Sequence, residues 1–207
     1  HRLQLGRWLP ALLPMLALAV VATAIPALLQ SALPLDLLRG GLERPSQGED
    51  LSALVIGLQL GLLLLIQWPV GRLLAERPVT TGLGLSLVCF AAGSGLLALS
   101  VLSRHGLALV LLSLLPLALG EAAFLPTATE AVVELSPAGH GGLAMALFSQ
   151  CFALSSLVAP LMAGLLLDGY HHGGVLWGLV SVSCLLDRKS KRLNSSHSSV
   201  FRMPSSA

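Results

Sequence analysis

Apolar residues run in long stretches along this chain, and short polar segments separate them. Six stretches stand out, at residues 9–32, 51–70, 79–101, 107–127, 143–167 and 175–186. Crossing the hydrocarbon core of a bilayer takes about 20 mostly apolar residues in a helix, and the first five stretches reach that length. Strands of a membrane barrel would instead alternate in polarity over about 10 residues. The pattern predicts an all-α polytopic membrane protein with six transmembrane helices.

The composition supports a membrane protein. Hydrophobic residues make up 55% of the chain and charged residues 11%, against about 25% charged in soluble proteins. Helices of a soluble globule need a polar face, and these stretches have none. Cys89, Cys151 and Cys184 lie inside apolar stretches, where a thiol behaves as a small hydrophobe. We therefore expect no disulfide, no metal site and no cofactor.

The last 21 residues differ in character from the rest. Lys189, Lys191 and Asn194, the only lysines and the only asparagine, lie there in a serine-rich segment. A basic tail that binds anionic lipid and a disordered linker are two interpretations. We favour a third, because residues 187–207 resemble the translation of a common short-read sequencing adapter. On this interpretation the native chain is residues 1–186, and its reading frame is interrupted within the sixth stretch.

Removing that tail changes the charge of the chain. The formal net charge is +2 over all 207 residues, but seven arginines and nine carboxylates leave −2 over residues 1–186. A nucleic-acid partner is therefore not expected. Arginine placement weakly favours a cytoplasmic N-terminus in the cell (inner) membrane. With that orientation Arg2, Arg7, Arg72 and Arg77 lie inside, while Arg39, Arg44 and Arg104 lie outside in loops that also hold Asp36, Glu43, Glu49 and Asp50.

The loop between the second and third stretches carries a motif. It consists of Gly71, Arg72, Leu73, Glu76 and Arg77. This segment resembles the loop signature of the major facilitator superfamily, although Ala75 stands where the family has an acid and Pro78 where it has a second glycine. Glu76 and Arg77 supply the charges one position late.

The fifth stretch carries a second motif of small residues. Its members are Ala146, Ser155, Ala159, Pro160, Ala163 and Gly164. They fall on the frame of the antiporter motif of the same superfamily, where small residues let helices approach closely and Pro160 can act as a hinge. Plain packing explains the frame equally well. Residues 164–168 repeat the loop signature on the opposite membrane face, as a 3+3 inverted repeat implies.

The resemblance implies one half of a twelve-helix transporter over residues 9–186. Such a half works by alternating access against a C-terminal half, with the substrate and coupling ion bound near the bilayer midplane. Its implied partners are the lipid bilayer, a small-molecule substrate, protons and the missing C-terminal half.

Polar residues inside the stretches are the candidate binding groups. Glu121 lies within the fourth stretch, where a carboxylate is costly and usually faces a cavity or a partner. Gln30, Gln59 and Gln150 are candidates for the same cavity, although glutamines inside a membrane more often bond neighbouring helices. Family antiporters carry an arginine and a glutamine earlier in this helix, but Pro116 and Leu119 occupy those positions here.

Two further acids follow Glu121. Glu130 and Glu134 lie four residues apart on one helix face, on the same side of the membrane as Arg72 and Arg77. The resemblance implies a charge cluster there that latches one conformation, and a solvated acidic pair is the alternative.

These features together favour secondary transport of a small molecule, with proton-coupled efflux as the leading interpretation. A uniporter or importer of the same fold is one alternative. A six-helix membrane enzyme or accessory protein is another, but we find no catalytic constellation, so we expect no enzyme activity.

Overall fold

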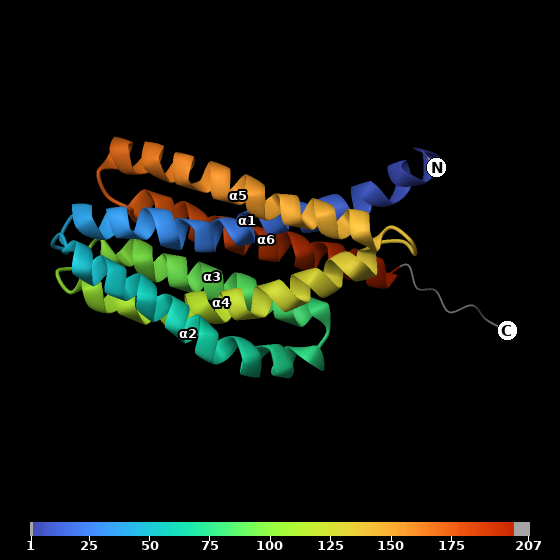
Figure 1. Cartoon of the computed structure of the whole chain (residues 1–207), viewed down its shortest axis with the longest axis horizontal. Helices are drawn as coiled ribbons and strands as arrows, with labels where there is room; N and C mark the ends of the chain where they lie inside the picture. The colour runs from blue at the N-terminus through green and yellow to red at the C-terminus, as the bar shows by residue number, and fades with distance from the viewer. Residues whose placement is uncertain (1, 201–207) are drawn as a thin grey trace.

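Six α-helices make up the described part of the chain in the computed structural model (Figure 1). The structure describes the backbone of residues 2–200 and the side chains of residues 8–188. The helices are α1 (Arg2–Arg39), α2 (Glu49–Ala75), α3 (Val79–Ser100), α4 (Gly106–Leu135), α5 (Gly141–Tyr170) and α6 (Gly174–Val200). No strand occurs within residues 2–200. Five helices are long and apolar enough to cross a membrane, and they cover all five full-length stretches of the sequence. The chain is an all-α polytopic membrane protein.

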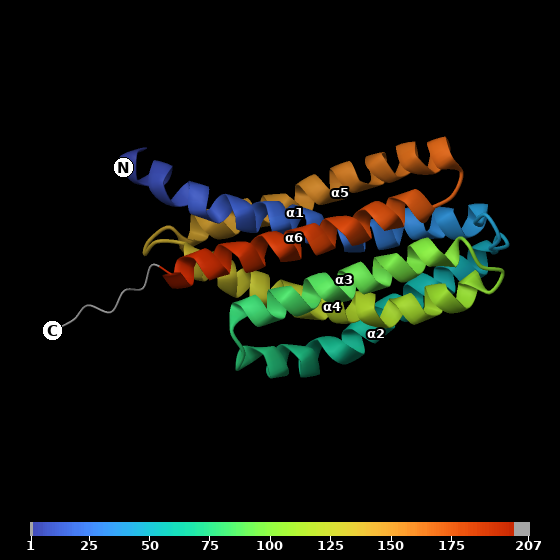
Figure 2. The ribbon, with the colours of Figure 1, turned by 180° about the vertical axis from the view of Figure 1, so that it is seen from behind.

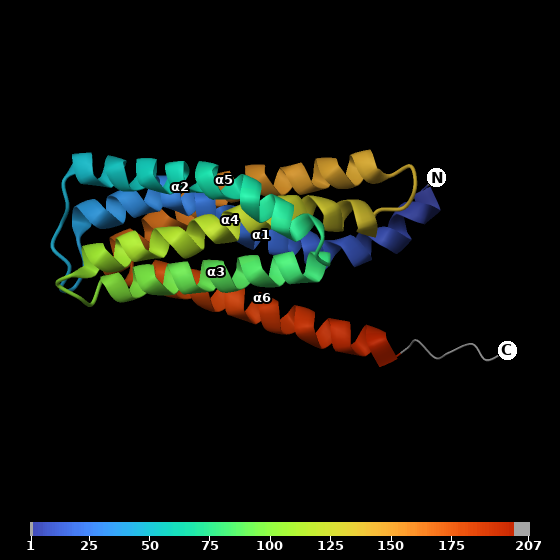
Figure 3. The same ribbon diagram turned by 90° about the horizontal axis from the view of Figure 1, so that it is seen from below.

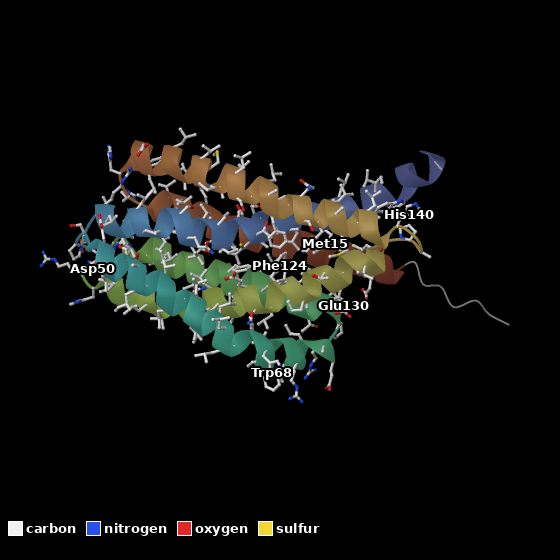
Figure 4. The ribbon with its side chains drawn as sticks, in the orientation of Figure 1. Met15, Asp50, Trp68, Phe124, Glu130 and His140 are labelled. Carbon is white, nitrogen blue, oxygen red and sulfur yellow. The ribbon has the colours of Figure 1, made fainter. Side chains whose placement is uncertain are left out.

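Successive helices run in opposite directions, so the bundle has two ends. We name the Asp36 end after a residue near the end of α1; the ends of α3 and α5 also lie there. The Glu130 end holds the ends of α2 and α4 and the start of α5. Figure 4 shows Asp50 at the first end and Glu130 and His140 at the second.

The six helices lie in three groups of two across the bundle. Figure 3 shows α3 and α6 along one side, α2 and α5 along the opposite side, and α1 and α4 between them. Seen from behind, α3 and α6 lie side by side (Figure 2), and they share an extensive contact. Helix α1 packs on α5, and α2 packs on α4. These two pairs correspond to each other when α4–α6 is matched to α1–α3, as an inverted repeat requires.

The closest helix contact joins α3 and α4. A Cβ atom added at Gly93 would lie 2.4 Å from Leu117 Cγ, and one added at Gly120 would lie 2.7 Å from Phe90 Cδ1. Glycine at these two positions therefore allows the two helices to approach, which is how helices associate in lipid.

Several helices are longer than the apolar stretches. Helix α1 continues to Arg39 and α4 to Leu135, past stretches that end at residues 32 and 127. Gly40, with φ of +82°, ends α1 in the left-handed conformation that favours glycine. Helix α6 begins close to the predicted residue 175 and runs through residue 186 to Val200. The adapter origin of residues 187–207 stays a prediction, and residues 201–207 lie outside the described part of the chain.

Candidate functional site

Glu121 lies about midway along α4 and faces α1 and α2. The other described acidic and basic side chains lie nearer to helix ends or in loops. Because Gly120 is pressed against Phe90 of α3, the next residue, Glu121, is turned away from that helix. It borders a small cavity among α1, α2 and α4. The cavity is lined by Pro26, Leu29, Gln30 and Leu33 of α1, Ile56, Gln59 and Leu60 of α2, and Glu121.

The cavity is small and mostly apolar. Its volume is about 10 Å³, close to the minimum that holds one water molecule. Neither of the two ion pairs among the described residues involves Glu121. The arrangement therefore places one carboxyl group, without a charged partner in this part of the chain, next to a water-sized space.

The two glutamines beside Glu121 differ in their surroundings. Gln59 is buried, and the amide orientation that satisfies both of its groups donates to the Leu114 carbonyl oxygen at 3.0 Å and accepts from Ala118 N–H at 3.3 Å. It thus ties α2 to α4. Gln30 is exposed on the described surface of α1. Of the two glutamines, Gln59 is thus the one that links helices.

Gln150 lies elsewhere. It is exposed on α5 and lines an open, apolar groove between α1 and α5, together with residues such as Leu16 and Val20. The structure thus brings Gln30 and Gln59 together with Glu121 in one cavity, and it places Gln150 in a separate groove.

The loop motif lies at the Glu130 end. Arg72 lies over the ring of Trp68, with its guanidinium carbon 5.0 Å from the ring centroid, and Figure 4 shows Trp68 at that end. The loop members Leu73, Glu76 and Arg77 are exposed, and an added Cβ at Gly71 would meet nothing within 4 Å.

Glu130 and Glu134 are exposed at the same end. Both ion pairs among the described side chains lie at the Asp36 end, so none joins these acids to Arg72 or Arg77. The predicted latch stays a prediction.

The small residues of α5 fall on two faces. Ser155, Ala159 and Ala163 are buried, whereas Pro160 and Gly164 are half-buried and Ala146 is exposed. Ser155 Oγ lies 2.8 Å from Thr23 Oγ1 and 2.8 Å from the Val20 carbonyl oxygen, both on α1. The first face therefore packs α5 on α1 with hydrogen bonds in the middle of the membrane.

Comparison with known families decides the class of protein. The family model described as Major Facilitator Superfamily matches residues 8–191, most of the chain. The chain belongs to the Major Facilitator Superfamily. A search of curated proteins and a search of solved structures gave no match.

Membership of the Major Facilitator Superfamily fixes the general role. Its members are membrane transporters, which agrees with five membrane-length helices. This chain is thus a multi-pass membrane protein of a transporter family. The six-helix arrangement is consistent with half of the fold of the Major Facilitator Superfamily.

The sequence did not indicate the role of the two charged residues with the most hydrogen bonds. Asp36 and Arg44 were expected in the first loop, outside the membrane, and the structure shows that both side chains are fully buried and form an ion pair of 3.0 Å. Asp36 belongs to α1 rather than to the loop. The available signal was glycine, because a Cβ atom added at Gly173 would lie 2.4 Å from Asp36 Cγ and one added at Gly106 would lie 2.9 Å from Arg44 Cδ.

Proposed function

We propose that this chain is the N-terminal six-helix half of a proton-coupled exporter of small molecules in the cell (inner) membrane. The observation that carries the proposal is the Glu121 carboxyl group, which lies at membrane depth beside a water-sized cavity with Gln30 and Gln59. Ionisable groups at that depth are costly and mark ion or substrate pathways. A carboxyl group at that depth can bind and release a proton.

The proton would couple to transport through the charge of Glu121. A neutral carboxyl group is far cheaper to hold in a low-dielectric region than a carboxylate, so protonation favours conformations that close the site from water. Release of the proton favours conformations that expose the site. Alternating access links these steps to movement of the substrate on the opposite phase of the cycle.

The missing C-terminal half would pack on the side that carries α2 and α5. This side lies opposite α3 and α6 (Figure 3). It holds the cavity beside Glu121 and the groove beside Gln150, the two places where a partner half would complete a substrate site. Large exposed apolar residues cover both helices: Leu54, Leu58, Leu64, Leu65 and Trp68 on α2, and Leu154, Leu157, Leu161 and Leu165 on α5.

With a cytoplasmic N-terminus, the Glu130 end lies inside the cell. Glu130, Glu134, Arg72 and Arg77 would then latch the cytoplasmic side in one conformation of the complete transporter. Pro160 and Gly164, on the half-buried face of α5, would contribute packing or a hinge at the junction of the halves.

The coupling experiment uses the complete transporter in proteoliposomes with an imposed pH gradient. Glu121→Gln is expected to abolish proton-driven flux, whereas Glu49→Gln, which removes an exposed carboxylate at the start of α2, retains it. Proton-driven flux that persists in Glu121→Gln would overturn the role of Glu121. Flux in the unmodified protein that ignores the pH gradient would support the uniporter or importer alternative.

The architecture is tested by sequencing the gene past the codon for Leu186 from intact template. Six further membrane helices are expected after a long loop. A stop soon after α6 would identify a six-helix unit, and would favour an accessory membrane protein over half of a transporter.

A further inference from the structure

The Gln59 side chain of α2 bonds the backbone of α4 at two neighbouring groups. Its amide donates to the Leu114 carbonyl oxygen at 3.0 Å and accepts the Ala118 N–H at 3.3 Å, in the orientation that satisfies both. In a regular α-helix these two backbone groups, four residues apart, bond each other. One side chain of α2 therefore reaches both partners of a single backbone hydrogen bond of α4.

Pro116 lies between these two positions of α4. Proline has no N–H group, so the Leu112 carbonyl oxygen lacks the donor that the residue four positions later would supply. In a membrane, backbone groups freed in this way depend on neighbouring helices for their bonding. A side chain that enters the hydrogen-bond ladder of a helix is also a recognised cause of bending. Gln59 thus bonds α4 at the turn where its own backbone bonding is interrupted.

Gln59 also marks the point on α2 where burial of its side chains ends. Ser52, Val55 and Gln59 are buried in the bundle, and the next buried residue of the helix is Leu74, near its end. Between them, residues 60–73 present only half-buried and exposed side chains. The hydrogen bonds of Gln59 therefore hold α2 on α4 at the edge of the buried part of this contact.

Glu121 lies one turn of α4 away from these bonds. It follows Ala118 by three residues, which places the two residues on one face of the helix. The part of its cavity wall that belongs to α2 consists of Ile56, Gln59 and Leu60. Because the cavity measures only about 10 Å³, a small displacement of α2 changes how much water the space beside the carboxyl group can hold. The bonds of Gln59 and the carboxyl group of Glu121 are thus adjacent parts of one contact between helices.

We propose that Gln59 is a positioning residue for Glu121. By bonding α4 on both sides of Pro116, it holds α2 at the separation that limits the cavity to a water-sized space, and so sets the pH at which Glu121 gains and loses its proton. In this role Gln59 acts through the backbone of α4 rather than on the proton. The role rests on the proposed function of Glu121 as the proton-binding group.

The titration of Glu121 is measured on the chain in lipid nanodiscs with dicyclohexylcarbodiimide, an apolar reagent that labels protonated carboxyl groups. Mass spectrometry follows the labelling rate of Glu121 over a series of pH values, and Glu121→Gln identifies signal from other residues. Gln59→Met keeps the length of the side chain but removes both hydrogen bonds. It is expected to lower the pH of half-maximal labelling by about one pH unit, a tenfold change in proton affinity, because water admitted beside the carboxylate stabilises its charged form.

The position of α2 is measured separately, as its distance from α4. Spin labels are introduced as noncanonical amino acids at Leu65 of α2 and Leu125 of α4, which are both exposed. The electron–electron distance distribution is expected to broaden at least twofold in Gln59→Met. Gln67→Met, the same substitution at an exposed position about two turns further along α2, is the matched control and is expected to leave both measurements unchanged.

The two measurements together decide whether Gln59 positions Glu121. A lower labelling midpoint together with a broader distance distribution supports the proposal. A shifted midpoint with an unchanged distance would mean that Gln59 acts on Glu121 directly. A broader distribution with an unchanged midpoint would mean that Gln59 only joins two helices. Either of these results, or no change in both measurements, would overturn the proposal.

A failure of the proposed function gives a different result. Absence of Glu121 labelling at every pH in the unmodified chain would contradict the proton site itself, and with it the role of Gln59. A normal titration of Glu121 that Gln59→Met does not move contradicts the role of Gln59 alone.

Gln59→Met is expected to fold, because the Leu114 carbonyl oxygen and the Ala118 N–H can then bond each other and no buried backbone group is left unpaired. Gln59→Asn is the second variant. It keeps the amide but shortens the side chain by one methylene group, so the amide no longer reaches α4 in the same way. The same shift and the same broadening are expected for it, and the same results would overturn the proposal.

Discussion

The two ends of this bundle treat their charged residues in opposite ways. At the Asp36 end, an aspartate and an arginine are fully buried and bonded to three helices and a loop. At the Glu130 end, acids and arginines are exposed, and Arg72 rests on the face of Trp68. The first arrangement joins the two three-helix units of the chain, whereas the second leaves its charges available to water or to another partner. A charged residue at a helix end therefore does not by itself link helices. Its burial and its bonding partners decide whether it does.

The largest loss of stability, and so the strongest test of this contrast, is expected for Arg44→Met. This variant leaves the Asp36 carboxylate buried without its cation. Removing one partner of a buried pair costs about 3–5 kcal/mol of stability. We expect a large fall in the thermal unfolding temperature in detergent, followed by intrinsic tryptophan fluorescence. Because Arg44 Nε has no hydrogen-bond partner among the described residues, the double variant Asp36→Leu/Arg44→Met is expected to recover most of the loss. A double variant as unstable as the single one would contradict this account.

The second largest loss of stability is expected from a steric clash with the Asp36 carboxylate. A Cβ atom at Gly173 would lie 2.4 Å from Asp36 Cγ, so Gly173→Ala must displace the side chain or the turn. Overpacking of this kind costs about 1–3 kcal/mol. The matched control is Gly169→Ala in α5, where the added Cβ meets nothing within 4 Å. A lower unfolding temperature for Gly169→Ala than for Gly173→Ala would contradict this prediction.

A smaller loss of stability is expected midway between the two ends, where Ser155 of α5 contacts α1. Ser155→Ala removes a hydroxyl that bonds Thr23 and the Val20 carbonyl oxygen, and hydrogen bonds between membrane helices contribute about 0.6 kcal/mol. A small fall in unfolding temperature is expected. Ser149→Ala is the control, because Ser149 is exposed and bonds only within its own helix, to Met145. An equal fall in both variants would show that the contact across the helices adds nothing.

The smallest effect is expected at the Glu130 end. Glu130→Gln removes repulsion from Glu134 four residues away, which is worth about 0.2–0.5 kcal/mol on an exposed helix face. Unfolding temperature should rise slightly at low salt, and the difference should vanish at high salt because screening removes it. At the other end, Asp168→Asn loses an exposed ion pair and should cost less than about 1 kcal/mol. A destabilised Glu130→Gln would indicate a partner for this acid.

The helices could be predicted because lipid leaves few choices. A segment in the hydrocarbon core must satisfy its own backbone hydrogen bonds, so apolar length alone indicates a helix. The stretch at residues 79–101 accordingly matches Val79–Ser100 within one residue. The end of α1 could not be predicted in this way. The polar residues after position 32 suggested a loop, whereas burial with Arg44 and Trp177 allows Asp36 to remain in the helix.

The candidate site was partly readable from the sequence. Glu121 stood out because an acid is rare in the middle of a membrane helix. Which glutamines lie beside it depends on how α1, α2 and α4 pack, and the sequence of each helix alone does not encode that. For the same reason Asp36 was missed, because its donor Trp177 lies 141 positions further along the chain.

The close approach of α3 and α4 at Gly93 and Gly120 bears on how the chain assembles during synthesis. The repeat boundary falls between these two helices, yet the most extensive helix contact crosses it. Helices α1–α3 alone therefore lack the surface that α3 needs, and α4 supplies it. The three-helix repeat is thus not an independently packed unit, because α3 gains its most extensive contact only when α4 is in place.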